Sequence, residues 1–312
     1  MIWGRETGPF LFVRYWGIGI IGTKCISREV KLLAKIKIVT DSTMDLPKET
    51  ITRYGIEVVP LAINVGGETY LDGVDIDPET FLGKMKQSSE LPKSSQPSTG
   101  AFLEVYDRLG RDGYEVLSIH MTGKMSGTVR SAESAASMSE AKVTVVDSEF
   151  ISKALGFQVR EAAEMASEGK TMDEILARLE AIRENTRLYI MVDTLENLVK
   201  GGRIGKGKAF LGSLLNIKPI ASLEGAEYTP VAKVRSHAQV VKYLAKQFAD
   251  DVKGKTIKGV GIAHAGAAGL AEKIKENIYE LTGYEGVETD YTNSTVSTHT
   301  GPGAIALMYY FE

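Results

Sequence analysis

Hydroxyl side chains and glycines gather in short stretches of this 312-residue sequence that could hold a negatively charged group. The densest is Ser94-Ser95-Gln96-Pro97-Ser98. Serine hydroxyls beside free backbone N–H groups at a helix start form a neutral cradle for one carboxylate or phosphate. The competing interpretation is a capped loop, in which Ser98 or Thr99 simply begins the next helix. For this stretch alone, capping is the favoured interpretation.

A second stretch, Thr122-Gly123-Lys124-Met125-Ser126-Gly127-Thr128, lies between a predicted strand and a predicted helix. Glycines let the backbone approach a ligand closely, and the helix N-terminus adds partial positive charge. The stretch is not a P-loop, because the G-x-x-x-x-G-K-[ST] spacing fails. Ser126 also lacks the G-x-S-x-G frame of a hydrolase nucleophile. We therefore expect this loop to hold an anion without attacking it.

Two further stretches carry a histidine and arginines. His299-Thr300-Gly301-Pro302-Gly303 is predicted to be a glycine-rich loop before the last strand, where a second anion contact is plausible chemistry. Lys200-Gly201-Gly202-Arg203-Ile204 offers an arginine that could pair with phosphate or cap the preceding helix. Arg235, after a predicted strand, has the same ambiguity. From spacing alone, surface ion pairing is favoured for both arginines.

Composition sets the broad class. Hydrophobic residues make up 43% and charged residues 25%, the balance of a soluble globular protein long enough for two domains. A net charge of -3 gives no support for a nucleic-acid partner. The single cysteine forms no intrachain disulfide and is compatible with a reducing compartment, so we expect a cytoplasmic protein. One cysteine and four scattered histidines make a dedicated metal site improbable.

Residues 1–34 differ from the rest of the sequence. The apolar run at residues 10–21 is interrupted by Arg14 and is shorter than the ~20 residues of a bilayer span, so we expect no stable membrane insertion. It is also a poor match to a secretory signal. The alternative interpretation is that this extension is not native and that the working protein starts near Leu32 or Leu33.

The elements that would position these stretches begin at residue 35. Strands alternate with helices over residues 35–152, which indicates a parallel, helix-covered, Rossmann-like sheet. In such a sheet, ligands bind outside the carboxyl ends of the strands. The loops that we expect to share that face are residues 40–43, 94–98, 122–128 and 147–148.

The second half, residues 153–312, has a different pattern. Residues 217–223 and 227–234 form a predicted strand pair around Glu224-Gly225. Predicted strands at 188–192, 257–264 and 304–311 accompany amphipathic helices. This predicts a mixed α+β domain, so the fold class is α/β with two domains, divided near residue 152.

Six ordered motifs give the sequence a strong resemblance to the DegV family. The match runs from residue 36 to the C-terminus and consists of Val39-Thr40-Asp41-Ser42-Thr43, Ser95-Gln96-Pro97-Ser98, Met125-Ser126-Gly127-Thr128, Lys200-Gly201-Gly202-Arg203-Ile204, Ile217-Lys218-Pro219-Ile220 and His299-Thr300-Gly301-Pro302-Gly303-Ala304. The resemblance implies a two-domain α/β fold with a buried long-chain fatty acid as ligand and no other cofactor. It also implies the fatty-acid-binding subunit of a fatty acid kinase. A separate ATP-binding kinase subunit would convert the presented carboxylate to acyl phosphate for phospholipid synthesis.

Site residues follow from the same resemblance, position by position. Ser94 and Ser126 would bind the carboxylate directly, and His299 would complete the head-group network. Arg203 and Arg235 would serve phosphotransfer or kinase docking. The supporting loop residues would be Ser95, Gly127, Thr300 and Gly301. The chain departs from the family at Ser94, where many members have threonine, and at Thr122-Gly123-Lys124-Met125, where many have Ser-Ser-x-Leu.

Two alternatives share this site. One is an enzyme, a hydrolase or transferase acting on a small acyl or phosphorylated substrate, with Ser126 or His299 catalytic. It would need a base beside the nucleophile, and no local Ser/His/Asp arrangement stands in the sequence. The other is a regulatory protein that senses lipid and differs only in its partner.

Overall fold

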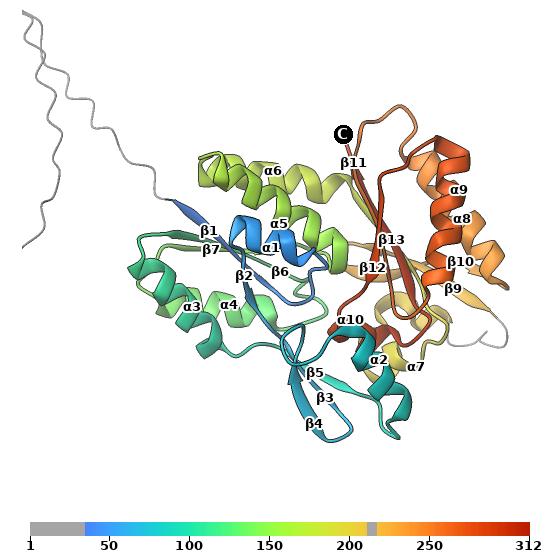
Figure 1. Cartoon of the computed structure of the whole chain (residues 1–312), viewed down its shortest axis with the longest axis horizontal. Coiled ribbons are helices and arrows are strands. Elements are labelled where there is room, and N and C mark those ends of the chain that lie inside the picture. The colour runs from blue at the N-terminus through green and yellow to red at the C-terminus, as the bar shows by residue number, and fades with distance from the viewer. Residues whose placement is uncertain (1–34, 211–216) are drawn as a thin grey trace, which may run out of the picture. The chain divides into compact units, whose positions relative to one another are not determined.

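The computed structural model describes residues 35–210 and 217–312 (Figure 1). The described residues belong to one compact unit, and their strands form three β-sheets. The expected N-terminal extension, residues 1–34, lies outside the described residues, so its interpretation stays a prediction.

The first sheet is parallel, with the strand order β2-β1-β6-β7. Its strands are β1 (Ile36–Asp41), β2 (Glu57–Val59), β6 (Glu115–His120) and β7 (Val143–Asp147). Alternate residues of β1 face opposite layers, as the period of a strand requires. Val39 shares a core with α3 (Thr99–Arg111) and α4 (Thr128–Met138), whereas Ile38 shares one with α5 (Ser152–Ser167). The predicted helix-covered parallel sheet is confirmed.

The second sheet is mixed, with the strand order β10-β9-β8-β13-β11-β12. Its strands are β8 (Thr186–Met191), β9 (Lys218–Glu224), β10 (Glu227–Val234), β11 (Ile257–His264), β12 (Val287–Tyr291) and β13 (Ile305–Phe311). Only β11 and β12 pair in parallel, and the other pairs are antiparallel. The predicted mixed α+β half is therefore confirmed, including the β9–β10 pair.

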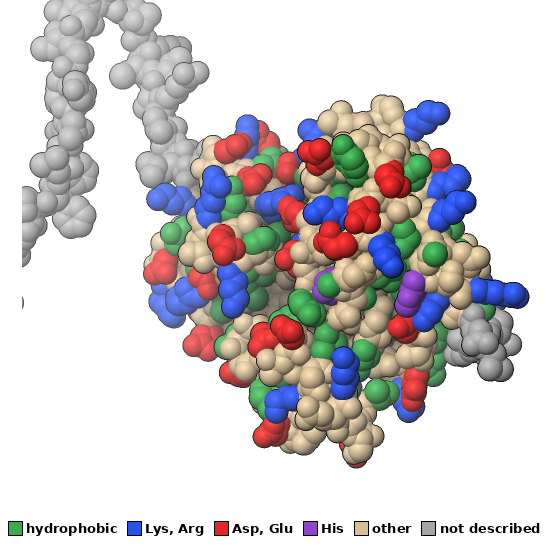
Figure 2. Space-filling model, turned by 45° about the vertical axis from the view of Figure 1, so that its right-hand side comes forward, with side chains coloured by type: hydrophobic (Ala, Val, Ile, Leu, Met, Phe, Trp, Pro, Cys, Tyr) green, Lys and Arg blue, Asp and Glu red, His purple; other side chains and the backbone are tan. Residues whose placement is uncertain are grey.

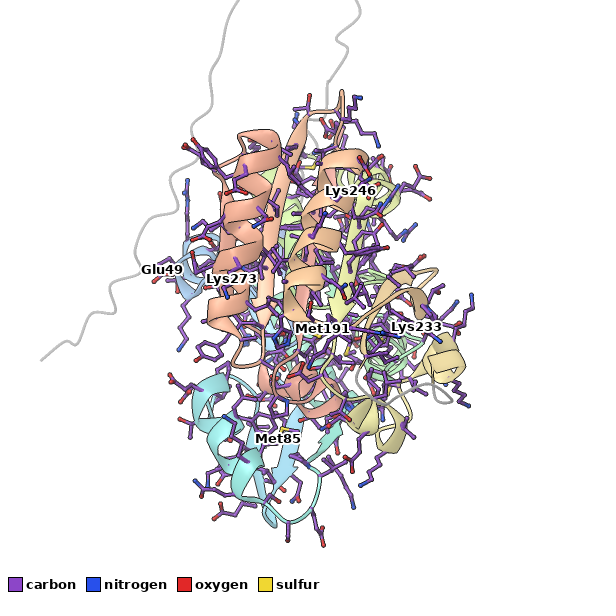
Figure 3. All side chains as sticks on the ribbon, turned by 90° about the vertical axis from the view of Figure 1, so that its right-hand side faces the viewer. Glu49, Met85, Met191, Lys233, Lys246 and Lys273 are labelled. Carbon is purple, nitrogen blue, oxygen red and sulfur yellow. The ribbon has the colours of Figure 1, made fainter. Side chains whose placement is uncertain are left out.

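Helices cover both faces of the second sheet. On β8, Ile190 faces the core shared with α5 and α6 (Met172–Asn185), while Met191 faces the core under α8 (His237–Asp251) and α9 (Ala268–Thr282). Figure 3 shows Met191 beneath these two helices, whose Lys246 and Lys273 point outward. Because α5 packs against β1 as well as β11 and β13, it lies between the two sheets. The domain boundary near residue 152 falls at the start of this shared helix and stays a prediction.

The third sheet is small and antiparallel, in the order β4-β3-β5. It contains β3 (Ala62–Val65), β4 (Glu68–Leu71) and β5 (Lys93–Ser95), and α2 (Pro78–Gln87) connects β4 to β5. Its β3–β4 turn uses Gly66-Gly67, both with positive φ, as a two-residue hairpin turn requires. Residues 56–64 look like one β run, but Pro60 separates β2 from β3, which belong to different sheets.

Short helices complete the fold. They are α1 (Lys48–Tyr54), α7 (Glu196–Lys200), the 3-10 helix η1 (Gly205–Phe210) and α10 (Ser294–Thr300). Helix α10 packs against α2, α7, β3 and β5. No helix in residues 35–210 and 217–312 combines the length and apolar character needed to cross a bilayer. The face in Figure 2 mixes acidic and basic side chains.

Candidate functional site

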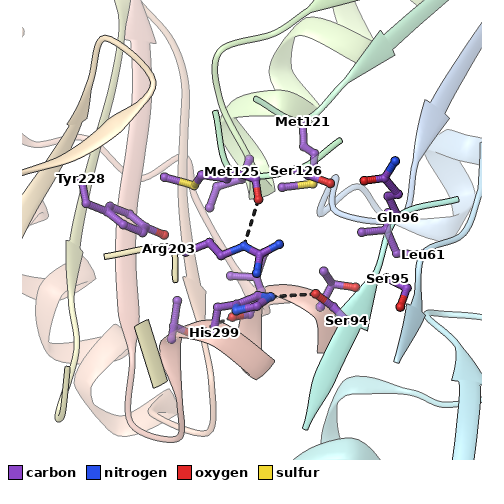
Figure 4. A pocket seen from close by; sticks show the side chains of 14 residues that line it. Leu61, Ser94, Ser95, Gln96, Met121, Met125, Ser126, Arg203, Tyr228 and His299 are labelled. Atoms are coloured by element: carbon purple, nitrogen blue, oxygen red, sulfur yellow. Dashed lines mark hydrogen bonds between the residues drawn. The ribbon is translucent and has the colours of Figure 1, made fainter. Parts of the chain in front are cut away.

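A cavity of about 280 Å³, called here the main cavity, opens where loops of the first sheet meet β5 and α10 (Figure 4). Its apolar walls come from Leu61, Met121, Met125, Ile151, Tyr228 and Val296. Its polar walls come from Ser94, Ser95, Gln96, Ser126, Arg203, Thr295, His299 and Thr300. None of the described lining residues is acidic. The cavity therefore suits a ligand with an apolar body and an anionic end.

The polar end is organised by a serine–histidine pair. Oγ of Ser94, on β5, lies 2.7 Å from Nε2 of His299, in the last turn of α10. The sequence predicts loops at both positions. That prediction is wrong, because Ser94 pairs with Ile63 in the third sheet and His299 is helical. Regular elements fix both side chains more firmly than loops would.

His299 is uncharged at neutral pH. Burial lowers its pKa from the ordinary value of 6.5 to about 4, and the nearby charge of Arg203 acts in the same direction. Arg203 is then the charged side chain among the described lining residues. A carboxylate in the main cavity would meet hydroxyls, a neutral imidazole and one guanidinium.

This shifted pKa predicts a pH effect on stability. The unfolded chain binds the His299 proton near pH 6.5, whereas the folded protein binds it only near pH 4. Between these values the unfolded state holds more protons, so stability falls as the pH falls through this window. Wild type should lose roughly 3 kcal/mol more than His299→Gln between pH 7 and 4. Urea unfolding at stepped pH measures this, and parallel curves for the two proteins would contradict it.

The loop between β6 and α4 presents Ser126. Its Oγ hydrogen-bonds with Oγ1 of Thr128 at 2.8 Å, which leaves a further hydroxyl interaction for a ligand. Gly127, the N-cap of α4, packs against the side-chain amide of Gln96, since a Cβ there would lie 2.0 Å from Oε1 of Gln96 and would displace that amide. Gln96 in turn donates to Ser131 at 2.8 Å. The serine-rich stretch and the glycine-rich loop thus pack directly on each other.

Contacts from the second half of the chain hold the same loop. Arg203 donates from Nε to the carbonyl oxygen of Met125 at 3.0 Å and from Nη1 to that of Gly201. Lys124 donates from Nζ to the carbonyl oxygen of Gly225, in the β9–β10 turn, at 2.8 Å. The cavity is therefore closed by parts of both halves.

The backbone at Gly201 packs against the ring of His299. A Cβ at position 201 would lie 2.4 Å from Nδ1 of His299 and 2.9 Å from the carbonyl oxygen of Asn197. Nδ1 is buried and has no hydrogen-bond partner among the described residues. Only glycine at this position allows the ring to keep its place.

Gly201→Ala should therefore displace His299 and lower the melting temperature by a few degrees, since overpacking costs about 1–3 kcal/mol. The matched control is Gly269→Ala, in α9, where an added Cβ meets nothing within 4 Å. Differential scanning calorimetry compares the two. Equal melting temperatures would show that the ring tolerates the added methyl group.

A second serine–histidine arrangement is sealed inside the first sheet. Asp41 Oδ2 lies 3.1 Å from Nδ1 of His120, and Nε2 of His120 lies 2.7 Å from Oγ of Ser118. Tyr106 donates to the same Oγ at 2.7 Å, and all four side chains are fully buried. Burial acts to raise the pKa of Asp41, but its interactions with His120 and Thr43 outweigh burial and lower it. The backbone N–H of Met121 also donates to Asp41. This buried hydrogen-bond network therefore supports the wall of the main cavity, which Met121 lines.

A second cavity, of about 550 Å³, lies on the other side of the serine–histidine pair, and we call it the outer cavity. It shares Ser94, Arg203 and His299 with the main cavity and also contains Lys93 and Lys200. These three shared residues form the wall between the two cavities.

The structure places the expected site residues as follows. Ser94, Ser95, Ser126, Arg203, His299 and Thr300 line the main cavity together. Gly127 and Gly301 cap helices beside it without lining it. Arg235 is exposed just before α8, outside both cavities, with its backbone N–H on Gln239. Of the loops expected to share one face, residues 40–43 and 147–148 lie outside the cavity lining.

The fold is α/β, and the composition of the main cavity suits an amphipathic anion. The chain belongs to the DegV family, described as uncharacterised proteins, whose model matches residues 35–312. A DegV domain-containing protein of Listeria monocytogenes is 43% identical over 281 residues, covering 90% of this chain and 100% of the relative.

Two solved structures are similar over 89% of this chain and 100% of their own length, each at 34% identity. One is a DegV family protein from Thermus thermophilus, described by its fatty acid binding, with a TM-score of 0.84. The other is DegV from Bacillus subtilis, described as a fatty acid binding protein, with a TM-score of 0.81.

Proposed function

We propose that this protein binds a long-chain fatty acid and presents its carboxylate to a partner kinase in the cytoplasm. The observation that carries the proposal is the Ser94–His299 pair at the polar end of a cavity that also has apolar walls, formed by residues such as Leu61 and Val296. Fatty acid binding by the similar Thermus and Bacillus proteins supports it.

The head group would be held mainly by neutral donors. A buried carboxylate must keep hydrogen bonds to offset its lost hydration. Hydroxyls of Ser94 and Ser126 can donate to it, His299 polarises Ser94, and Arg203 supplies positive charge. Since Arg203 already donates to two carbonyl oxygens, it would steady the carboxylate without locking it in a tight ion pair.

The acyl chain would leave the main cavity past Ile151 and Val296. These residues and Thr300 also line a small cavity of about 20 Å³, called the tail cavity. Its other walls are Ser152, Leu188, Ile190, Ala263, Thr292, Ala304, Ile305 and Ala306. Burial of methylene groups at about 0.8 kcal/mol each gives a C16 chain roughly 10 kcal/mol before ordering costs.

Calorimetric titration of delipidated protein with palmitate tests this binding. We expect saturable uptake of one molecule per chain, with a negative heat-capacity change from buried apolar surface. A titration that shows only the heat of dilution would refute the proposal.

The partner kinase would approach the carboxylate from the outer cavity, which borders Ser94 and His299. Its ATP-binding subunit would form the acyl phosphate that feeds phospholipid synthesis. Arg203 stands in the wall between the cavities, and Arg235 is exposed and suited to docking.

Arg235→Ala should therefore leave palmitate affinity within about twofold and slow acyl phosphate formation by about tenfold or more, as loss of a charged interface contact would. The matched control is Arg53→Ala, an exposed arginine on α1. The rate is measured with saturating palmitate, ATP and the kinase subunit. Equal rates for both variants would remove Arg235 from the docking surface.

The Ser94–His299 pair is better suited to binding a carboxylate in a carrier than to catalysis in a hydrolase. A general base works best with a pKa near the operating pH, whereas His299 has a pKa of about 4. Its Nδ1 has no carboxylate partner among the described residues, and Gly201 occupies the space beside it. Ester turnover that disappears in Ser126→Ala would favour the enzyme instead.

A further inference from the structure

Two carboxylates anchor the N-terminus of helix α10. Asp45 accepts the backbone N–H of the N-cap residue Asn293 at 3.0 Å, and Asp72 accepts from the first helical turn. Asp72, just after β4, is 2% exposed. Its Oδ1 accepts the backbone N–H of Ser294 at 3.1 Å. Its Oδ2 accepts the backbone N–H and the hydroxyl of Thr295 at 3.1 and 2.6 Å. Asp72 therefore occupies several donors of the first helical turn, where negative charge is favourable.

The same residue is tied to the wall of the main cavity. The backbone N–H of Asp72 donates to the carbonyl oxygen of Leu61 at 2.9 Å. Its Oδ2 also accepts the hydroxyl of Ser42 at 3.3 Å, and the Ser42 oxygen accepts the backbone N–H of Leu61 at 3.1 Å. Leu61 lines the main cavity.

These contacts connect both ends of α10 to the third sheet. At the far end of the helix, His299 bonds to Ser94 of β5. Strand β5 pairs with β3, where Ile63 is opposite Ser94, and Leu61 directly precedes β3. The third sheet thus holds α10 at both ends, through Asp72 at the start and Ser94 at the finish.

The sequence of α10 makes this anchoring necessary. Ser-Thr-Val-Ser-Thr-His-Thr contains only residues of modest helix propensity, and seven residues are too few for a helix that is stable by itself. Asn293 adds one cap by accepting the backbone N–H of Val296 at 2.8 Å. Burial raises the pKa of Asp72 above its usual value, and the hydrogen bonds from Thr295 and Ser294 only partly oppose this effect.

We propose that Asp72 is a positioning residue of the carboxylate site, which fixes α10 so that Nε2 of His299 meets Oγ of Ser94. Asp72 lies outside the lining of the main cavity, so it acts through the helix. The inference rests on the proposed function in one respect, namely that this pair receives a fatty acid carboxylate.

The test compares Asp72→Asn with the wild type. Asparagine keeps the size of aspartate but turns an N–H2 group toward the donors of α10, so the helix should shift. Palmitate affinity should fall about tenfold, in line with a lost charge-assisted hydrogen bond. NMR titration should show the pKa of His299 rising from about 4 toward 6.5 as the ring leaves its buried position. Asp77→Asn makes the same change at the N-cap of α2, where Asp77 accepts from Thr80, and should change neither quantity.

A double-mutant cycle separates positioning from general destabilisation. If Asp72 acts through His299, Asp72→Asn should cost no further affinity in a His299→Ala background. An equal loss in both backgrounds, or an unchanged pKa of His299 in Asp72→Asn, would overturn the proposal.

If Asp72→Asn fails to fold, the test uses Thr295→Val instead. This variant removes the 2.6 Å hydrogen bond from Thr295 to Asp72 and keeps the shape of the side chain. The same shift in the pKa of His299 is then expected, and an unchanged value would overturn the proposal. Wild-type protein that binds no palmitate would refute the proposed function, whereas the NMR comparison would still decide the role of Asp72.

Discussion

Removal of the two hydroxyls proposed to bind the carboxylate, in Ser94→Ala/Ser126→Ala, is expected to weaken palmitate binding at least ~100-fold. Hydrogen bonds to a charged group are each worth about 1.5–3 kcal/mol, and this variant loses two of them. It also leaves Nε2 of His299 without its partner. Competition against a fluorescent fatty acid measures the affinity.

The matched control is Ser134→Ala/Ser137→Ala, which removes two exposed hydroxyls on α4. It should bind palmitate as the wild type does. If the cavity variant stays within threefold of this control, Ser94 and Ser126 do not hold the carboxylate.

Val296→Phe is expected to abolish the dependence of affinity on chain length. Val296 lines both the main cavity and the tail cavity, so a larger ring there would block the passage between them. In wild type, each added methylene should improve binding by about 0.8 kcal/mol. In the variant, affinity should stop rising beyond the length at which the chain meets the ring, so that palmitate loses more than 100-fold.

A series from octanoate to stearate, measured by calorimetry, separates this effect from damage to the head-group site. Octanoate should bind to both proteins with similar affinity. Val74→Phe, at a 68% exposed position, serves as the control. A variant that loses all chain lengths equally would point to a disturbed α10, and an unchanged series would place the acyl path elsewhere.

The family, the fold class and the proximity of the main polar residues could be predicted from the sequence. Motifs at the carboxyl ends of predicted strands identify loops that a parallel sheet brings together, and Ser126 follows β6 in this way. The position of Ser94 does not follow from that rule, since it belongs to the third sheet. The resemblance of the ordered motifs placed it at the same site.

The local structure around Ser94 and His299 could not be read from the sequence. The strand Lys93–Ser95 is three polar residues long and has no apolar alternation. Helix Ser294–Thr300 has weak propensity and exists because distant carboxylates and a buried environment hold it. The polar edge strand β12, Val287–Tyr291, was not predicted from the sequence for a similar reason, because its pairing with β11 stabilises it.

The apolar lining of the main cavity could not be predicted from the sequence either. Leu61, Ile151 and Val296 look like ordinary core residues, and only the fold shows that they border a cavity. Tyr228 lies in β10, and Figure 4 shows its hydroxyl end directed toward Arg203. Asp72 follows a turn, whereas its hydrogen-bond partners in α10 are more than 220 residues away in the sequence.

Native mass spectrometry of protein purified from bacterial cells tests the central claim most directly. The account predicts a species heavier than the bare chain by one long-chain fatty acid, which is absent in Ser94→Ala/Ser126→Ala and restored to delipidated wild type by palmitate. Wild-type protein that shows only the bare mass, before and after palmitate is added, would contradict it.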